Sequence, residues 1–372
     1  MSIGADSDLF DEQARDYDAV VVVSFGGPEG PHDVEPFLDR VLSGLPVKPE
    51  TRARIAQRYQ AFGGVSPING HTREFIAALQ RELDHHGPAL PIYWGNRNWH
   101  PLLADTFKQM DKDGVSRAIA FVTSTFSSYS GCRKYREDLY QAAQSMCNAP
   151  QIDRLRLGFN HPGFIAAATD RVAETLHKIP ASRRGETPIL FSAHSLPESM
   201  AHNCDYEQQL GESCILIAAA LEHSRWQLVY QSNNASYSRE AWLAPDIRDA
   251  IGAAKKEGAD DVVVAPIGFN CDHMEVVLDL DIEAQEHAAS VGITMHRAAT
   301  VGTHPAYVSM VRDLIVERMS AAPERPALGS LGPSYDYCPT DCCLSGKATL
   351  DKPTCGGPDQ GVTQDGNQHR GE

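Results

Sequence analysis

Continuous apolar runs alternate with amphipathic stretches along most of the chain. The run Ala19 to Phe25 (AVVVVSF) is rich in β-branched residues and ends in a Gly-Gly-Pro turn, which is typical of a buried parallel strand. Similar runs predict further strands at residues 91–94, 118–123, 188–194, 227–231, 261–267 and 292–296. Apolar residues at helical spacing predict helices between them at residues 72–85, 162–179 and 206–223. Strands separated by helices indicate an α/β fold with parallel sheets flanked by helices.

The strand-and-helix pattern runs twice, which predicts two α/β domains followed by a region of different character. We place an N-terminal domain at residues 17–165, a C-terminal domain at 166–304 and a closing helix at 305–320. A Gly- and Pro-rich extension follows at 321–359, where four cysteines argue against disorder, and we expect a disordered tail at 360–372. Two open α/β domains that face one another form a cleft where the carboxyl ends of their strands meet, and ligands bind at such ends.

Composition narrows the functional class. The chain contains 33 Lys and Arg against 49 Asp and Glu, a net charge of −16 that argues against nucleic-acid binding, because such binding depends on phosphate neutralisation. No apolar run reaches the roughly 18 residues of a membrane helix, so we expect no integral membrane segment. The acidic stretch Met1 to Asp18 lacks the features of a signal peptide, which favours the cytoplasm. Nine cysteines, an odd number, then indicate metal binding rather than a disulfide framework.

A column of carboxylates is the strongest local signal of function. Glu275, Asp279 and Glu283 recur at four-residue spacing after the apolar run 261–267, and Asp272 is a plausible helix N-cap. Such a column also occurs on ordinary solvated helix faces. Here its neighbours are strongly apolar and no Lys or Arg is interspersed, although like charges at this spacing destabilise a helix. The pattern therefore favours a site that handles divalent metal ions or protons.

A histidine at a second strand end extends this signal. The segment FSAHSLP ends a predicted strand at His194, and Pro197 prevents immediate continuation into a helix interior. Because its ordinary pKa lies near neutrality, a histidine at a strand end can act as a base or a metal ligand. A structural histidine is an equally good interpretation of His194 taken alone. The Gly-rich segments GGP and FGGVSPIN match no nucleotide-binding fingerprint and are interpreted as loops that let the backbone approach a large flat ligand.

These segments together resemble the ferrochelatases. SFGGP, FGGVSPIN, GNRNWHP, FSAHSLP and GFNCDHMEVVLDLDIE occur in this order, and the resemblance covers about residues 18 to 320. It implies two Rossmann-like, chelatase-type domains around a porphyrin cleft, and insertion of ferrous iron into the porphyrin. It also implies that His194 and Glu275 face each other across the metal site as catalytic residues and metal ligands, with Asp279 and Glu283 continuing a polar path outward.

Further motifs narrow the resemblance. GPEGP, SPINGHT, GNRNW and YSGCRKYRE resemble the actinobacterial-type enzymes, which act on coproporphyrin III and make coproheme for a later decarboxylase. The resemblance implies that Ser66 and Tyr135 contact the porphyrin and that Arg58 and Tyr59 lie beside a propionate. Phe25 occupies a position where some relatives carry a tyrosine, so an apolar surface is expected beneath the metal. Arg97 is a further candidate cation for the porphyrin carboxylates.

The cysteines fit the same family, because several ferrochelatases carry a 2Fe-2S cluster. The resemblance assigns Cys132 as an internal ligand, with Cys338, Cys342 and Cys343 supplying three more thiolates. Adjacent cysteines in an extended chain point to opposite faces, so a turn is needed for both to bind. Cys355 is a possible substitute for one of them, and a four-thiolate zinc site is the rival interpretation.

The function predicted from these residues is insertion of Fe²⁺ into coproporphyrin III during heme biosynthesis. The two pyrrole protons of the porphyrin must leave, and His194 is the first choice of base. Glu275 and the carboxylate column then strip water from iron, carry protons away, or both. The alternatives are a protoporphyrin IX ferrochelatase, a cobalt or nickel chelatase of the same fold, and a non-catalytic tetrapyrrole carrier or redox-sensing module. The carboxylate column argues against the last class, because holding a porphyrin requires no acidic column.

Overall fold

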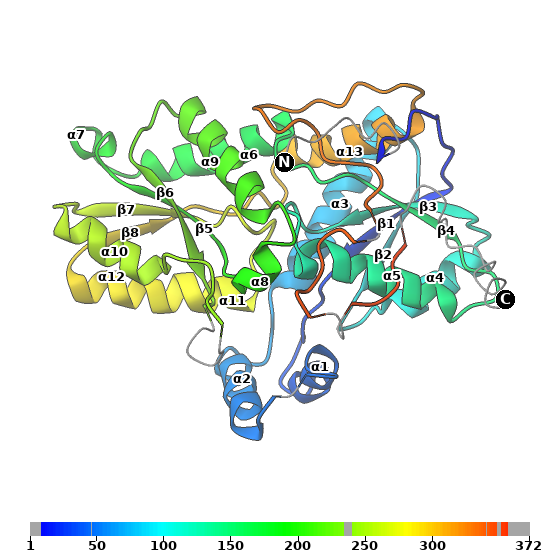
Figure 1. Ribbon diagram of the computed structural model, residues 1–372, viewed down its shortest axis with the longest axis horizontal. Helices are drawn as coiled ribbons and strands as arrows, with labels where there is room; N and C mark the ends of the chain where they lie inside the picture. Colours follow the sequence, from blue (N-terminus) through cyan, green and yellow to red (C-terminus); the bar gives the residue numbers. More distant parts are fainter. Residues whose placement is uncertain (1–8, 46, 234–239, 340, 348–350, 356–372) are drawn as a thin grey trace.

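Two parallel four-stranded sheets with helices on both faces form the body of the protein (Figure 1). The computed structural model describes residues 9–45, 47–233, 240–339, 341–347 and 351–355. The first sheet, of order β2-β1-β3-β4, contains β1 (Ala19–Ser24), β2 (Ile92–Asn96), β3 (Arg117–Val122) and β4 (Gln151–Arg154). The second, of order β6-β5-β7-β8, contains β5 (Ile189–His194), β6 (Trp226–Gln231), β7 (Asp261–Ala265) and β8 (Thr294–Arg297). The predicted fold class is confirmed.

Helices connect the strands of each sheet. In the first half they are α1 (Val34–Val41), α2 (Pro49–Ala61), α3 (Ile68–His86), α4 (Leu103–Lys112), the π-helix η2 (Tyr129–Arg133) and α5 (Lys134–Gln144). In the second half they are α6 (Pro162–Leu176), α7 (Ala181–Arg184), α8 (Glu198–Ala201), α9 (Tyr206–Ala220), α10 (Ile247–Lys256), α11 (Met274–Val276), the π-helix η4 (Val277–Ala284) and α12 (Gln285–Val291). The last is α13 (Pro305–Met319). The predicted domain boundary at residue 165 falls inside α6.

One strand was not predicted. β4 reads Gln151-Ile-Asp-Arg154, which lacks a continuous apolar run, yet its last three residues are buried. The Asp153 carboxylate accepts hydrogen bonds from Arg117 and Tyr17, and Arg154 donates to the sulfur of Cys338. Charged side chains are therefore tolerated in this edge strand because tertiary partners neutralise them.

One large apolar cluster contains residues of both sheets. Helix α13 packs against both α3 and α6, as Figure 1 shows. Phe75 of α3, Phe164 of α6 and Tyr307 of α13 lie in the same buried cluster as Val20 of β1 and Phe191 of β5. Burial of large aromatic side chains contributes strongly to stability, so this core holds the strand ends of the two halves in a fixed relationship.

Helices α1 and α2 form a hairpin that projects from the first half of the molecule (Figure 1). The hairpin has its own small cluster around Phe37 and Leu38, separate from the main core. Its two ends meet where Glu29 pairs with Val65 and the Ser66 N–H donates to the Pro28 carbonyl at 2.8 Å. This hairpin carries Arg58 beyond the sheet edge.

The Cys-bearing extension is ordered over its described part and folds back onto the first half. The Tyr337 N–H donates to the Leu9 carbonyl at 3.0 Å, and the Arg136 guanidinium donates to the Cys355 carbonyl at 2.9 Å. In Figure 1 the extension, orange to red, passes along the top and descends beside α5. The predicted tail, 360–372, lies outside the described residues.

Candidate functional site

His194 and Glu275 are brought together from two different strand-to-helix connections. His194 is the last residue of β5, and its Nε2 lies 3.5 Å from Oε2 of Glu275. The other ring nitrogen, Nδ1, lies 2.5 Å from the Ser195 carbonyl oxygen, which can only accept a hydrogen bond. Nδ1 of the neutral ring therefore carries the proton, and Nε2 presents its lone pair toward the carboxylate. Both side chains reach solvent, with 31% and 54% of their surface exposed.

The helix that carries Glu275 begins with a histidine cap. Nδ1 of His273 accepts the Glu275 N–H at 3.2 Å, whereas Asp272 pairs with Arg297 at 2.6 Å. The prediction that Asp272 caps the helix is therefore wrong, because the guanidinium of Arg297, bound to both Asp272 and Asp281, is the stronger partner. Burial lowers the pKa of His273, which keeps the cap uncharged beside His194.

The carboxylate column continues along the π-helix η4. Asp279 accepts a hydrogen bond from the Ser232 hydroxyl. Burial, reinforced by the nearby Glu275 and Glu283 carboxylates, raises the pKa of Asp279 to about 6. π-Helical turns are rare and occur frequently at functional sites. The column therefore contains one carboxyl group that exchanges protons near neutral pH.

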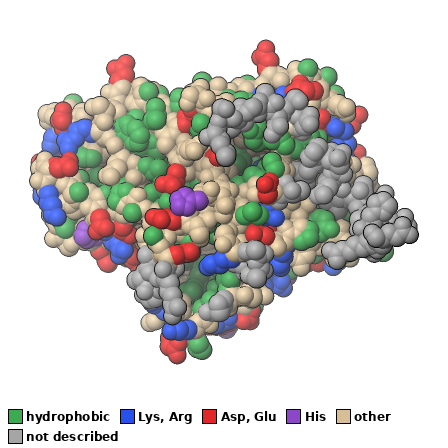
Figure 2. Space-filling model, viewed as in Figure 1, with side chains coloured by type: hydrophobic (Ala, Val, Ile, Leu, Met, Phe, Trp, Pro, Cys, Tyr) green, Lys and Arg blue, Asp and Glu red, His purple; other side chains and the backbone are tan. Residues whose placement is uncertain are grey.

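Two arginines neutralise the outer end of the column. Glu283 lies 3.2 Å from Arg58 on the projecting hairpin and 3.8 Å from Arg248 on α10. The Arg58–Glu283 pair links the two halves of the molecule across the site. Figure 2 shows acidic side chains gathered beside a histidine near the middle of this face.

Aromatic residues and a buried ion pair lie on the side of the first half of the chain. The Arg97 guanidinium stacks 4.5 Å from the ring centre of Tyr135 and 5.6 Å from that of Phe25. It also pairs with Asp138 at 2.5 Å, and only 8% of the Arg97 side chain is exposed. The expectation that Arg97 offers a cation to porphyrin carboxylates is therefore wrong, because its charge is buried and already neutralised. Its geometry orients Tyr135 and Phe25 instead.

Ser66 lies in the Gly-rich segment that follows α2, and Tyr59 lies near the end of α2, just before that segment. A Cβ atom at Gly27 would lie 2.6 Å from Cβ of Ser66, so the turn after β1 requires glycine for this close approach. Ser66 is buried by this packing. The Tyr59 ring lies 5.5 Å from that of Phe37, and burial raises the pKa of Tyr59 while Glu275 adds to the effect. Tyr59 is therefore un-ionised and electrostatically close to the acidic side of the site.

Four cysteine thiols gather between η2 and the extension. The Cys132 side chain is in hydrogen-bond contact with the sulfurs of Cys338 and Cys343, and Cys342 is in contact with Cys338. The adjacent sulfurs of Cys342 and Cys343 lie 3.4 Å apart, because Cys343 adopts a left-handed conformation with φ of 56°. The turn that the sequence required for both cysteines is present.

The four thiols differ in how their surroundings affect ionisation: hydrogen bonds within the set, together with burial, raise the pKa of Cys132, Cys342 and Cys343. Hydrogen bonds from Cys132 and Cys342, together with Arg154 at 3.1 Å from the sulfur, lower the pKa of Cys338 well below its ordinary value. Ligation requires the thiolate form. Cys355 is buried among the apolar side chains of α5 and β3. Within the described part of the chain, no group of three or more His, Cys, Asp or Glu side chains is arranged to hold a metal ion. What the structure shows at these four cysteines is therefore a set of pairwise thiol contacts.

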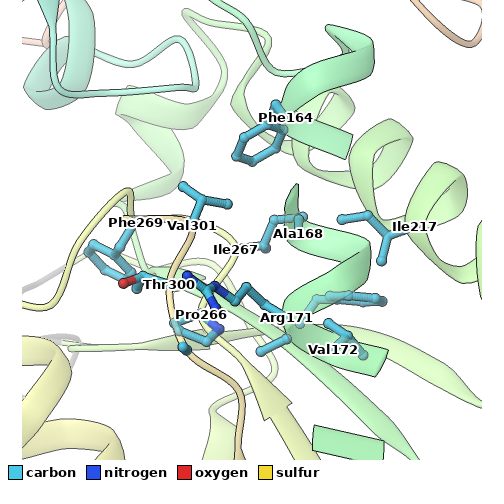
Figure 3. Close-up of a pocket in the computed structure, with 13 residues that line it drawn as sticks. Phe164, Ala168, Arg171, Val172, Ile217, Pro266, Ile267, Phe269, Thr300 and Val301 are labelled. Carbon is cyan, nitrogen blue, oxygen red and sulfur yellow. The ribbon is translucent and has the colours of Figure 1, made fainter. Parts of the chain in front are cut away.

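A separate small cavity of about 20 Å³ lies in the second half, between α6 and the segment that follows β7 (Figure 3). Its walls are mainly apolar, and Figure 3 shows Arg171 reaching across it toward Pro266 and Thr300. The Phe269 ring on its wall lies 4.7 Å from that of His273. None of the His194 or carboxylate-column residues lines this cavity. We therefore assign the site from the convergence of His194 and Glu275 rather than from cavity size.

Three site residues were not predicted from the sequence: His273, Ser232 and Arg248. The motif DHME contains the signal for His273, since a side-chain acceptor two residues before Glu275 is in the position of a helix cap. Ser232 directly follows β6, and Arg248 lies in the first turn of α10. Only the tertiary fold brings these two side chains to the carboxylates.

Comparisons with known proteins identify the family to which the chain belongs. The ferrochelatase family profile matches residues 17–319, and the chain therefore belongs to the ferrochelatase family. It is 52% identical over 332 residues to a ferrochelatase of Rhodopirellula baltica, covering 88% of this chain and 93% of the relative. It is 43% identical over 366 residues to a coproporphyrin III ferrochelatase of Streptomyces griseus, covering 92% of this chain and 96% of the relative. The structure of SirB from Bacillus subtilis with Fe³⁺ aligns with 80% of this chain and 94% of its own, at 11% identity and a TM-score of 0.49.

No helix among the described residues is both long and apolar enough to span a bilayer.

Proposed function

We propose that this protein inserts Fe²⁺ into coproporphyrin III to form coproheme. The observation that carries the proposal is the 3.5 Å approach of His194 Nε2 to the Glu275 carboxylate at the meeting point of two strand ends. Membership of the ferrochelatase family supports the reaction. Relatives named coproporphyrin III ferrochelatase, from Streptomyces griseus at 43% identity and Streptomyces coelicolor at 42%, support the porphyrin.

In this proposal His194 accepts the two pyrrole protons one at a time at Nε2 and passes the first to the carboxylate column before it accepts the second. Two N–H protons leave the ring as Fe²⁺ forms bonds to the four nitrogens, so the charge of the macrocycle site is balanced. The lone pair of Nε2 is available because Nδ1–H is held by the Ser195 carbonyl. A positioned base of this kind contributes about 10²- to 10⁴-fold to rate.

Glu275 and the column deliver iron and remove protons. The Glu275 carboxylate is an oxygen ligand that can replace water on the incoming Fe²⁺ while His194 faces it. Asp279, with a pKa raised to about 6 by burial, takes up and releases protons near neutral pH. Glu283, held by Arg58 and Arg248, continues this path toward solvent.

The porphyrin is proposed to lie against Phe25, Tyr135 and Ser66. Phe25 is partly exposed, which suits contact with a flat macrocycle, whereas Tyr135 is 5% exposed and is held in place by Arg97. Arg58, with 47% of its side chain exposed, is available beside a propionate, with Tyr59 next to it in the chain. Coproporphyrin III has four propionates and protoporphyrin IX two, so an exposed cation such as Arg58 favours the former.

Initial rates of iron insertion into the two porphyrins, measured side by side without oxygen, test the substrate. The proposal predicts turnover of coproporphyrin III at least about tenfold above protoporphyrin IX in kcat/KM. Equal rates, or a preference for protoporphyrin IX, would support the alternative ferrochelatase instead, and insertion of cobalt or nickel but not iron would support the third candidate. The product coproheme keeps its four propionates, so a later decarboxylase is the proposed consumer.

We also propose a 2Fe-2S cluster bound by Cys132, Cys338, Cys342 and Cys343, with Cys355 as a possible substitute. The contacts among the four thiols and the thiolate-favouring surroundings of Cys338 support it. When bound, such a cluster supplies one-electron redox chemistry or a cross-link between η2 and the extension. Iron and sulfide analysis of anaerobically purified protein tests this, and zinc in place of iron would support the rival four-thiolate site.

The cytoplasm is the proposed location. All nine cysteines are free of disulfides, which suits a reducing compartment. Assay of fractionated cells with an antibody to the chain tests this placement.

A further inference from the structure

The helical segment formed by η2 and the start of α5 presents two sets of side chains to two different structures. Cys132, Arg133, Arg136 and Glu137 contact the extension, whereas Tyr135 and Asp138 meet Arg97 beside the proposed porphyrin surface. A helix turns by about 100° per residue. This places residues 132, 133, 136 and 137 on one side of the segment and residues 134, 135 and 138 on the other. One rigid segment therefore joins the extension to the site.

Arg136 is the central contact on the extension side. Its side chain is almost wholly buried, with the residue 1% exposed. Nε donates to the Cys355 carbonyl at 2.9 Å, and Nη2 donates to the Thr354 hydroxyl at 3.1 Å and toward the Cys338 carbonyl at 3.5 Å. One guanidinium thus holds both ends of the segment between residues 338 and 355 against α5.

The neighbouring residues reinforce this attachment. The Glu137 carboxylate accepts the Lys352 N–H at 3.0 Å, and Arg133 donates to the Cys342 carbonyl at 3.1 Å and the Lys352 carbonyl at 3.3 Å. Buried charge-assisted hydrogen bonds are directional and costly to break. The extension therefore restrains the first turns of this helical segment.

On the opposite side, the same turns fix the proposed porphyrin wall. Asp138 pairs with Arg97 at 2.5 Å, and Arg97 stacks on Tyr135 at 4.5 Å and on Phe25 at 5.6 Å. Tyr135 and Asp138 belong to α5, while Arg97 follows β2 and Phe25 follows β1. A shift of the α5 start moves two members of this stack relative to the other two.

We propose that Arg136 is a positioning residue for porphyrin binding, which acts by tying the extension to the helix that carries Tyr135 and Asp138. The inference rests on the proposed function, because it takes the Tyr135 and Phe25 surface as the porphyrin wall. Arg136 touches no substrate in this account. Its loss weakens porphyrin affinity and leaves the chemistry at His194 intact.

The test compares Arg136→Met with Arg156→Met in full-length protein. Arg156 is the matched control, because it is also buried and donates to the Pro326 carbonyl of the extension at 3.0 Å. It pairs with Glu317 of α13 at 2.7 Å, and among the described residues it forms no hydrogen bond with α5. Titration with metal-free coproporphyrin III, followed by porphyrin fluorescence, gives the dissociation constant. Thermal unfolding gives the general loss of stability, and steady-state assays separate KM from kcat.

Arg136→Met is expected to raise the dissociation constant and the KM for coproporphyrin III roughly tenfold, equivalent to about 1.4 kcal/mol, with kcat within about twofold. Arg156→Met is expected to lower thermal stability comparably with porphyrin affinity within about twofold. Unchanged affinity in Arg136→Met, or an equal loss in both variants, would overturn the inference. If Arg136→Met does not fold, Thr354→Val removes one of its acceptors with little change of volume, and an affinity loss of about twofold is expected there against none if the inference is wrong.

The titration of wild-type protein distinguishes a failure of the proposed function from a failure of the inference about Arg136. Failure of wild-type protein to bind coproporphyrin III contradicts the proposed function. Tight binding by both wild-type protein and Arg136→Met leaves the proposed function standing and removes the role of Arg136.

Discussion

Nε2 of His194 faces the carboxylate of Glu275 at 3.5 Å, although one residue ends β5 and the other begins the helix after β7. The two strands are neighbours in the sheet, so their carboxyl ends lie at the same edge. The pair combines a nitrogen base whose lone pair is free with an oxygen ligand for Fe²⁺. This pairing is the basis of the predictions below.

Removing the Glu275 charge is expected to lower iron insertion while leaving the fold intact. Glu275→Gln keeps the shape of a side chain that is 54% exposed and removes its negative charge. We expect kcat with coproporphyrin III to fall by about 10²-fold or more. Asp281→Asn on the same helix is the control, because Asp281 pairs with Arg297 instead of His194 and its loss should leave kcat within about threefold. Equal losses of kcat in both variants would show that activity depends on the total negative charge of the helix and not on Glu275 in particular.

Asp279 is expected to make stability depend on pH in a defined direction. Burial raises its pKa from 3.8 to about 6, so folding favours the protonated form. The contribution of this group to stability is therefore greatest below about pH 4 and is lost as the pH rises to about 6. At one pKa unit per 1.4 kcal/mol the loss is at most about 3 kcal/mol.

Asp279→Asn removes this titration. The variant should gain stability relative to wild type as the pH rises from 4 to 7, when both are unfolded by urea at a series of pH values. A stability difference that stays flat across this range, or that shrinks toward pH 7, would contradict the assigned burial cost.

Arg58 is expected to affect porphyrin binding more than stability. Its ion pair with Glu283 spans 3.2 Å, but 47% of the Arg58 side chain is exposed, so the pair contributes about 0 to 1 kcal/mol to the free energy of unfolding. Arg58→Gln should raise the KM for coproporphyrin III about three- to tenfold through loss of a propionate partner. Arg248→Gln, whose distance to Glu283 is 3.8 Å, tests whether the effect comes through Glu283. Similar KM values in the two variants would place the role of Arg58 at Glu283 rather than at the porphyrin.

The thiol assignment predicts selective loss of iron from single variants. Cys132→Ser removes the sulfur in contact with both Cys338 and Cys343 and should abolish the visible absorption of a 2Fe-2S cluster in anaerobically purified protein. Cys147→Ser, at an exposed thiol, should retain it. A Cys132→Ser protein with full absorption, or wild-type protein with none, would refute the assignment.

The fold follows from the sequence where burial leaves a simple pattern. β1 is buried along its whole length, and its five β-branched or small apolar residues form the continuous run expected of a parallel strand. Asp153 and Arg154 of β4 are buried because Arg117 and the sulfur of Cys338 form hydrogen bonds with them. These partners are distant in the sequence, so no local pattern reveals them. Local periodicity therefore predicts strands with apolar neighbours and misses those with buried ion pairs.

The site follows from the sequence only in part, for a similar reason. His194 and Glu275 stand out because motifs and spacing mark them. The spacing of Glu275 and Asp279 does not distinguish an α-helix from the π-helix η4, because the two differ in which backbone groups bond and not in residue type. The pairing of Arg97 with Asp138 also could not be predicted from the sequence, because the end of β2 and α5 meet only in the folded chain.

The most direct test of convergence on one metal ion is the iron-insertion kcat of His194→Ala, Glu275→Gln and the double variant, with coproporphyrin III binding measured in each. Residues that act together on one ion give non-additive losses. The account predicts that the double variant is about as slow as the slower single variant while all three still bind coproporphyrin III. Losses that multiply in the double variant, or full activity in His194→Ala, would contradict it.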